Sequence, residues 1–339
     1  MTQPAYPLLF EPIYKEKVWG GRAMLNLGRD LPPGDIGESW ELADLATTSA
    51  SGGGGGVEYS AVANGPWQGQ TFHDLLQAYG RTLLGDLPLN EFGQFPLLVK
   101  FLDAHADLSV QVHPSAAYAA THPDAFLKSE AWYILDRTPG SCIYKGIVQG
   151  TTPQQFREAI KDNTVEELMI KVPVEPGDCH YLPSGTCHAL GAGVLAAEVQ
   201  TPSDTTFRVY DWGRTGRELH IEEALACIDF GPPPEASTPT HLEGPYATID
   251  RLVSCEYFRI DRVQVEAGMH EGLTHEQPRV WMILEGAGTI SGDFGETVTL
   301  PKGRTVYLPP KLSNATLTAD AAMTWLEVSF PQAQPGTLA

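Results

Sequence analysis

Short runs of apolar and β-branched residues, broken repeatedly by glycine and proline, follow one another along most of the chain. The 339 residues include 34 glycines and 27 prolines. Many short strands separated by turns are typical of an antiparallel barrel or sandwich, whereas a doubly wound sheet alternates strands with long helices. The pattern therefore predicts an all-β fold in which helices are local insertions.

Helical spacing of apolar residues is confined to four segments. It is clearest over residues 71–84, where Thr71 and Asp74 stand at positions that suit an N-terminal cap. Residues 152–160 begin with a threonine at the cap and a proline at the first helical position, which is the favoured place for proline. Residues 163–169 and 222–227 predict two shorter helices.

A proline-rich segment predicts a division of the chain into two domains. Residues 231–240 contain three consecutive prolines and are the best candidate for a linker. Beyond them, residues 255–330 repeat a rhythm of strands and turns that is related to the upstream part. We therefore expect tandem barrels, with a catalytic domain over residues 1–232 and a second domain over 240–335. The glycine tract at 52–56 is typical of a flexible surface loop.

Composition and net charge limit the possible binding partners and indicate the cellular compartment. The formal net charge of −20 argues against attraction to nucleic acid or to anionic membranes. An anionic ligand would need a local basic pocket, which makes lysines and arginines near a candidate site more informative. Five cysteines without a C-x-x-C pair, no signal segment and no apolar run of transmembrane length predict a reduced, cytoplasmic setting.

One predicted strand carries a polar pair on a single face. Gln111 and His113 are two residues apart within residues 107–114, so their side chains point the same way. Buried polar groups need partners, and a metal ion would satisfy both. Glu130 at the start of another apolar strand and His188 after a glycine-bearing turn complete a set of two nitrogen and two oxygen ligands. This set suits Zn²⁺ first, with Mn²⁺, Co²⁺ or Fe²⁺ as alternatives.

A lone buried histidine is more often a core residue with its hydrogen bonds satisfied than a metal ligand, and the Gln-x-His pair alone is weak evidence. The surrounding motifs give it weight. They are Phe-Pro-Leu-Leu-Val-Lys at 95–100, Leu-Ser-Val-Gln-Val-His-Pro at 108–114, Lys-Ser-Glu-Ala-Trp-Tyr at 128–133, residues 183–189 and residues 203–212, preceded by 18–21 and 37–41. Together they resemble type I mannose-6-phosphate isomerases, most closely the short bacterial form.

This resemblance implies tandem cupin (jelly-roll) barrels and a zinc-dependent aldose–ketose isomerase. Such an enzyme interconverts mannose 6-phosphate and fructose 6-phosphate through a cis-enediol. The small-molecule partner would be a sugar phosphate. The second barrel retains His275, but Val306 and Tyr307 fall where a later metal histidine would be expected, so we predict that it holds no metal.

The resemblance also suggests catalytic residues. Arg208 is expected beside the enediolate, where a permanently charged guanidinium stabilises negative charge but is a poor base. Glu198 is a candidate for proton transfer, with an ion pair to Arg208 as the alternative. Lys128 shares a strand face with Glu130 and is a further acid–base candidate.

Three residues are candidates for substrate binding. Lys100 and Ser109 are suggested by the resemblance, and Ser109 shares a face with Gln111. Arg214 is a candidate phosphate ligand, with a solvated loop charge as the alternative. Where the family has acidic residues after the His-Pro pair, this chain has Ser-Ala-Ala at 115–117.

Other functions stay open on sequence grounds. They are an Fe²⁺ dioxygenase on the same fold, a sugar-phosphate sensor without turnover, and an isomerase of another sugar phosphate.

Overall fold

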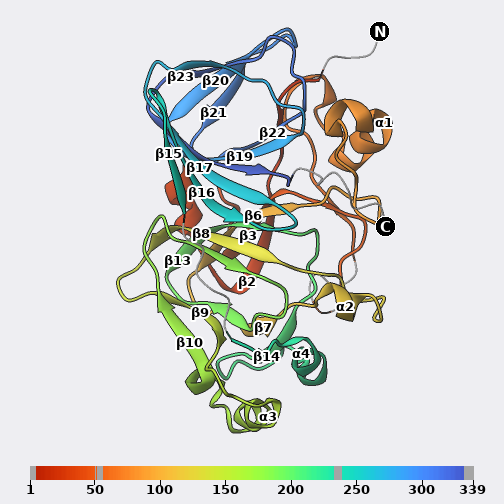
Figure 1. Cartoon of the computed structure of the whole chain (residues 1–339), viewed down its shortest axis with the longest axis vertical. Coiled ribbons are helices and arrows are strands. Elements are labelled where there is room, and N and C mark those ends of the chain that lie inside the picture. The colour runs from red at the N-terminus through yellow and green to blue at the C-terminus, as the bar shows by residue number, and fades with distance from the viewer. Residues whose placement is uncertain (1–4, 50, 52–55, 233–238, 332–339) are drawn as a thin grey trace. The chain divides into compact units, whose positions relative to one another are not determined.

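The structure is a computed structural model that describes residues 5–49, 51, 56–232 and 239–331. It consists mainly of antiparallel strands (Figure 1). The chain divides into two compact units. The site unit comprises the described residues of Pro12–Tyr59 and Glu91–Ala236, and the second unit comprises those of Met1–Glu11, Ser60–Asn90 and Ser237–Ala339.

The site unit contains two large sheets with the strand orders β11-β8-β13-β6-β3-β2 and β10-β9-β12-β7-β14, and a short pair, β4-β5. The strands of the first sheet are β2 Ile13–Gly21, β3 Ile36–Leu42, β6 Leu98–Ala104, β8 Glu130–Arg137, β11 Cys179–Leu182 and β13 Val194–Gln200. Those of the second are β7 Val110–Val112, β9 Cys142–Ile147, β10 Met169–Pro173, β12 His188–Leu190 and β14 Phe207–Tyr210. The short pair is β4 Asp44–Leu45 and β5 Glu58–Tyr59.

An apolar cluster joins these two large sheets face to face. Leu102 of β6 and Trp132 of β8 come from one sheet, and Ile143 of β9 and Leu190 of β12 come from the other. All four side chains are buried. Because successive residues of a strand point to opposite faces, polar residues in phase with this cluster also point between the sheets. The site unit is therefore a sandwich of the cupin type with room for chemistry inside.

The second unit also contains two antiparallel sheets, with the orders β1-β22-β19-β24-β17-β16-β15 and β18-β23-β20-β21. The strands of the first are β1 Leu8–Leu9, β15 Thr240–Glu243, β16 Ala247–Ser254, β17 Arg259–Val265, β19 Arg279–Glu285, β22 Thr305–Leu308 and β24 Met323–Ser329. Those of the second are β18 His270–Gly272, β20 Ala287–Ser291, β21 Val298–Pro301 and β23 Thr316–Ala319. The predicted all-β fold with tandem cupin barrels and helical insertions is confirmed.

The predicted helices are present. They are α1 Phe72–Leu84, α3 Pro153–Asp162 and α4 Ile221–Cys227, with a 3-10 helix at Val165–Leu168 where residues 163–169 were expected to be helical. The hydroxyl of Thr71 accepts a hydrogen bond from Asp74 N, and Thr152 forms a capping box with Gln155. Additional short helices are α2 Ala116–Ala119 and 3-10 helices at Ala23–Leu27 and Gly65–Trp67.

The predicted domain boundary at 232–240 falls beside the boundary between the units, although most of that linker and the glycine tract at 52–55 lie outside the described residues. Residues 60–90, which we assigned to the first domain, group with the second unit. One reason is that Phe72 of α1 packs edge-on against Tyr307 of β22, with 5.0 Å between ring centroids. The exact domain limits therefore stay a prediction. Every described helix is too short or too polar to cross a bilayer.

Candidate metal centre and active-site cavity

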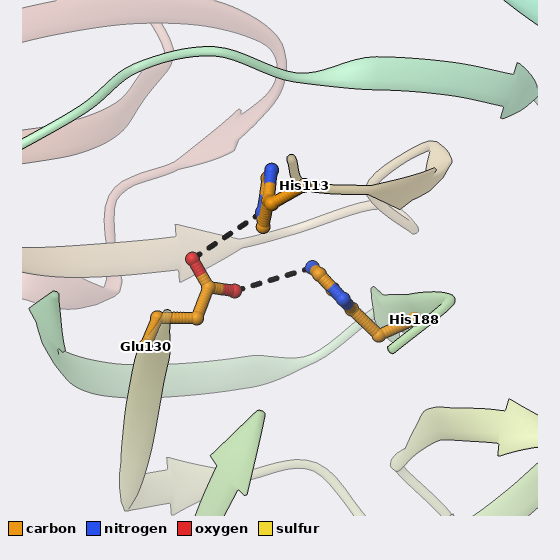
Figure 2. A group of neighbouring side chains, drawn as sticks. All are labelled: His113, Glu130 and His188. Atoms are coloured by element: carbon orange, nitrogen blue, oxygen red, sulfur yellow. Dashed lines mark ion pairs between the residues drawn. The ribbon is translucent and has the colours of Figure 1, made fainter. Parts of the chain in front are cut away.

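Three buried side chains converge between the two sheets of the site unit (Figure 2). His113 follows β7, Glu130 opens β8 and His188 opens β12. His113 Nε2 lies 3.4 Å from Glu130 Oε2, and His188 Nε2 lies 3.2 Å from Glu130 Oε1. All three residues are at most 2% exposed, so the group is sealed from bulk water.

Backbone carbonyl groups fix the orientation of both imidazoles. His113 Nδ1 lies 2.8 Å from the carbonyl oxygen of Thr205, and His188 Nδ1 lies 2.8 Å from that of Thr186. A carbonyl oxygen can only accept, so Nδ1 is the protonated nitrogen in each ring. Nε2 therefore presents a lone pair toward Glu130, which is the usual arrangement of a metal-ligating histidine with its outer partner.

These atoms lack the partners that burial requires. His113 Nε2 and both carboxylate oxygens of Glu130 are buried and make no hydrogen bond. Lys128 Nζ lies 2.9 Å from Glu130 Oε2 as an ion pair without hydrogen-bond geometry. Two nitrogen lone pairs that face a carboxylate repel it, and a divalent cation between them removes the repulsion. The donor set thus fits a divalent metal.

The pKa values of this group favour metal binding. Burial, together with the charge of Lys128, lowers the pKa of His113 to about 3, so its imidazole is neutral at pH 7. Burial raises the pKa of Glu130, but Lys128 and His113 more than offset this and hold it well below the ordinary value. Neutral imidazoles and an ionised carboxylate are the forms that bind metals.

Gln111 lies beside this group in the middle of a row of three side chains. On β7 it is the direct neighbour of His188 on β12 and of Arg208 on β14. Its Nε2 is 3.4 Å from His188 Nε2, and its Oε1 accepts a hydrogen bond from Ser109 Oγ at 3.3 Å. The amide nitrogen is no ligand, so Gln111 can bind a metal only after its amide oxygen and nitrogen exchange positions.

A cavity of about 350 Å³ opens beside the metal site, within the site unit. Its lining carries six basic and five acidic side chains, so it is less acidic than a chain of net charge −20 as a whole. The lining cations are Lys15, Lys17, Lys100, Lys128, Arg208 and Arg217. Five of these pair with carboxylates, while Arg208 has no carboxylate within ion-pair distance among the described residues. In the described part of the chain, Arg208 is therefore the lining cation without a carboxylate partner.

Arg208 is held by neutral groups. Its Nε donates to Ser109 Oγ at 3.2 Å, and a terminal nitrogen donates to the carbonyl oxygen of Glu218 at 2.8 Å. Burial and the charge of Arg217 lower its pKa, although a guanidinium stays protonated in proteins. The remaining N–H groups of Arg208, next to Ser109, thus form a donor site for an anionic group.

Glu198 pairs with Lys100 in place of the alternative partner Arg208. The two are direct neighbours on β13 and β6, and Lys100 Nζ lies 3.0 Å from Glu198 Oε2. Trp132 Nε1 donates to the other oxygen at 3.0 Å. Burial raises the pKa of Glu198, which Lys100 opposes.

Arg214 lies apart from the cavity lining. Its guanidinium donates to Asp211 Oδ1 at 2.7 Å and to the carbonyl oxygen of Asp107 at 2.6 Å. Arg217 lines the cavity instead, with Nε 2.8 Å from Asp211 Oδ2. Sequence reasoning overlooked Arg217, because only the folded loop around Asp211 determines which arginine faces inward. It also gave no role to Glu38, which lines the same cavity.

A cupin sandwich with a buried His-Glu-His group that fits a divalent metal, beside a polar cavity, is the architecture of a metal-dependent cupin enzyme. The catalytic-domain model of phosphomannose isomerase type I matches residues 8–144. Curated relatives extend the similarity along nearly the whole chain, and on this evidence the chain belongs to the type I phosphomannose isomerase family.

Two of these relatives are enzymes named for this activity. The mannose-6-phosphate isomerase ManA of Bacillus subtilis is 37% identical over 311 residues, which cover 88% of this chain and 93% of that protein. The mannose-6-phosphate isomerase of Streptococcus mutans is 36% identical, covering 90% of this chain and 93% of that protein. The crystal structure of the Bacillus subtilis mannose 6-phosphate isomerase matches with a TM-score of 0.84 at 29% identity, covering 96% of this chain and 100% of that one.

Proposed function

We propose that this chain interconverts mannose 6-phosphate and fructose 6-phosphate at the cavity of the site unit, through a cis-enediol. The main supporting observation is that two histidine nitrogens direct their lone pairs at one buried carboxylate, beside a cavity lined by six lysine and arginine side chains. The metal we propose is Zn²⁺ on Gln111, His113, Glu130 and His188, with Mn²⁺ or Co²⁺ as substitutes. A single negative charge among four ligands would leave such a cation with surplus positive charge.

Electrostatic stabilisation is the first task of the site. A bound divalent cation supplies Lewis acidity that polarises the substrate carbonyl and the neighbouring hydroxyl. Arg208 contributes a permanent charge near the enediolate oxygens. Its role is supported by its place beside Gln111 and by the lack of a carboxylate partner for it among the described residues. A preoriented donor of this kind stabilises charge that develops during the reaction.

Proton transfer is the second task. Glu198 is our candidate for the proton between C1 and C2, because burial raises its pKa and lets the carboxyl group exchange a proton more readily near neutral pH. Lys128, which lines the cavity beside Glu130, is the candidate for exchanging a proton with a substrate hydroxyl.

Holding the phosphate is the third task. We assign it to Ser109 and Arg217, with Lys100 as a further donor to a substrate oxygen; all three line the cavity. Arg214 acts indirectly in this proposal, because it binds the same Asp211 carboxylate that holds Arg217. The acidity of the whole chain makes such a local cluster necessary for an anionic substrate.

We further propose a cytoplasmic location and a sugar phosphate as the small-molecule partner, with neither nucleic acid nor membrane as a binding partner. All five cysteines are free, which suits a reducing compartment.

The decisive experiment measures fructose 6-phosphate formation from mannose 6-phosphate in an assay coupled to a dehydrogenase. Activity should disappear when a chelator strips the metal and return when Zn²⁺ is added. Metal content should follow the same course. Failure of every divalent metal to support isomerisation would refute the proposed function, whereas recovery with Fe²⁺ and oxygen consumption would support a dioxygenase.

A further inference from the structure

We propose that Glu38 is a positioning residue that, together with Glu198, holds the ammonium group of Lys100 so that one of its N–H groups points into the cavity. The inference rests on the proposed isomerase function and deepens it. It assigns a task to a carboxylate that neither binds the metal nor transfers a proton.

The strand register places Lys100 between two carboxylates. Lys100 lies on β6, with Glu198 directly opposite on β13 and Trp40 directly opposite on β3. Glu38 lies two residues before Trp40 and therefore shares its face of the strand. Lys100 Nζ is 3.0 Å from Glu198 Oε2 and 3.7 Å from Glu38 Oε2.

An ammonium group has three N–H donors in a fixed tetrahedral arrangement. Glu198 and Glu38 attract the ammonium from the two flanking strands as ion pairs without hydrogen-bond geometry, and the ring centroid of Trp40 lies 5.1 Å from Nζ. This arrangement fixes the position of the charge and leaves an N–H donor for the cavity that Lys100 lines. Burial lowers the pKa of Lys100, but Glu198 and Glu38 more than compensate and raise it above the ordinary value. Lys100 is therefore a permanent donor for a substrate oxygen and no base.

Glu38 is itself fixed in place. Trp40 Nε1 donates to its Oε2 at 2.7 Å, and Lys17 Nζ lies 3.0 Å from its Oε1. Burial raises the pKa of Glu38, but Lys17 and Lys100 together lower it far below the ordinary value, so it stays ionised. The result is a row of alternating charges, Lys17, Glu38, Lys100 and Glu198, that leads from the partly exposed Lys17 to the buried Glu198.

Without the charge of Glu38, Lys100 would form a simple ion pair with Glu198. The ammonium would then be free to turn away from the cavity. Small displacements of a group that contacts the reacting substrate reduce the rate strongly. A loss of positioning should therefore appear mainly in kcat.

The test variant is Glu38→Gln, because glutamine keeps an acceptor oxygen for Trp40 and removes only the charge. We expect kcat for mannose 6-phosphate to fall by about ten- to a hundredfold, with a smaller change in KM. Glu38→Asp, which keeps the charge, should recover part of the loss. Glu175→Gln is the matched control: it removes a carboxylate from the ion pair with Arg137, outside the cavity lining, and should leave kcat and KM unchanged.

A different result would follow if Glu38 only adjusted the charge of the cavity. Glu38→Gln leaves Lys17 uncompensated, so KM for the anionic substrate would fall while kcat stayed constant. The double variant Lys17→Met with Glu38→Gln restores the net charge, and positioning requires the loss of kcat to persist in it. An active wild type with unchanged kcat in Glu38→Gln overturns this inference alone, while an inactive wild type overturns the proposed function as well.

Discussion

The two units bury charged side chains in different ways. In the second unit, Asp261 accepts two hydrogen bonds from Arg251, at 2.8 and 3.0 Å, and Asp250 accepts two from Arg262. The site unit contains such a pair as well, between Glu41 and Arg29, but the carboxylates around its cavity face lysines and histidines, and Glu130 has no hydrogen bond to either oxygen. Among the described residues, every buried lysine and histidine belongs to the site unit.

This contrast separates structural from functional polar groups. A carboxylate held by a guanidinium fork has its hydrogen-bonding capacity filled, so it needs no further ligand. A buried carboxylate left without hydrogen bonds costs free energy unless a ligand completes it. Glu130 is therefore where we propose that a cation completes the site.

The largest effect should come from Glu130→Gln. Losing the carboxylate removes the charged ligand that both imidazoles face, so activity should fall by more than about 10³-fold. Metal content after dialysis, measured by elemental analysis, should fall with it. If the variant retained a full equivalent of metal, the distinction between the two units would be wrong, because Glu130 would then be a structural group like Asp261.

Arg208→Ala should have the next largest effect, because it removes the unpaired guanidinium of the cavity. We expect kcat/KM for mannose 6-phosphate to fall by about 10²- to 10³-fold. Metal content and thermal stability should stay close to those of the wild type, since in the described structure Arg208 is held by Ser109 and a carbonyl oxygen and by no carboxylate. Loss of metal in this variant would mean that Arg208 supports the ligands and not the substrate.

Asp261→Asn should behave in the opposite way. It breaks a bidentate pair in the second unit, so the free energy of unfolding should fall by about 1–2 kcal/mol in a urea titration. Neither kcat nor metal content should change. A substantial loss of activity would show that the second unit takes part in catalysis.

The smallest effect concerns pH. The hydrogen bond with His241 and the neighbouring Arg262 lower the pKa of Asp250 below its ordinary value, against burial. Its stabilising contribution is therefore present above the ordinary pKa of about 3.9 and is lost as pH falls below it. The stability difference between the wild type and Asp250→Asn should shrink between pH 5 and pH 3, by at most about 1 kcal/mol. Urea titrations at the two pH values check this.

Local features could be predicted from the sequence because they depend on neighbouring residues. A few neighbouring residues are enough to predict the helix caps at Thr71 and Thr152. The same holds for the shared strand face of Gln111 and His113. The partner of Glu198 could not be predicted, because the pairing of β6 with β13 brings Lys100 against it from a distant part of the chain. For the same reason, the place of α1 beside β22 and the choice between Arg214 and Arg217 appear only in the folded molecule.

The backbone anchors of the two imidazoles have a consequence for how this site tolerates mutation over time. The groups that hold His113 and His188 are the carbonyl oxygens of Thr205 and Thr186. Every amino acid carries that oxygen, so neither anchor can be deleted by exchanging a side chain. Side-chain substitutions at positions 186 and 205 would therefore leave the orientation of both imidazoles unchanged. Insertions or deletions that shift the backbone would change it. In a lineage of diverging homologues, the lengths of these two loops should be preserved more strictly than their residues.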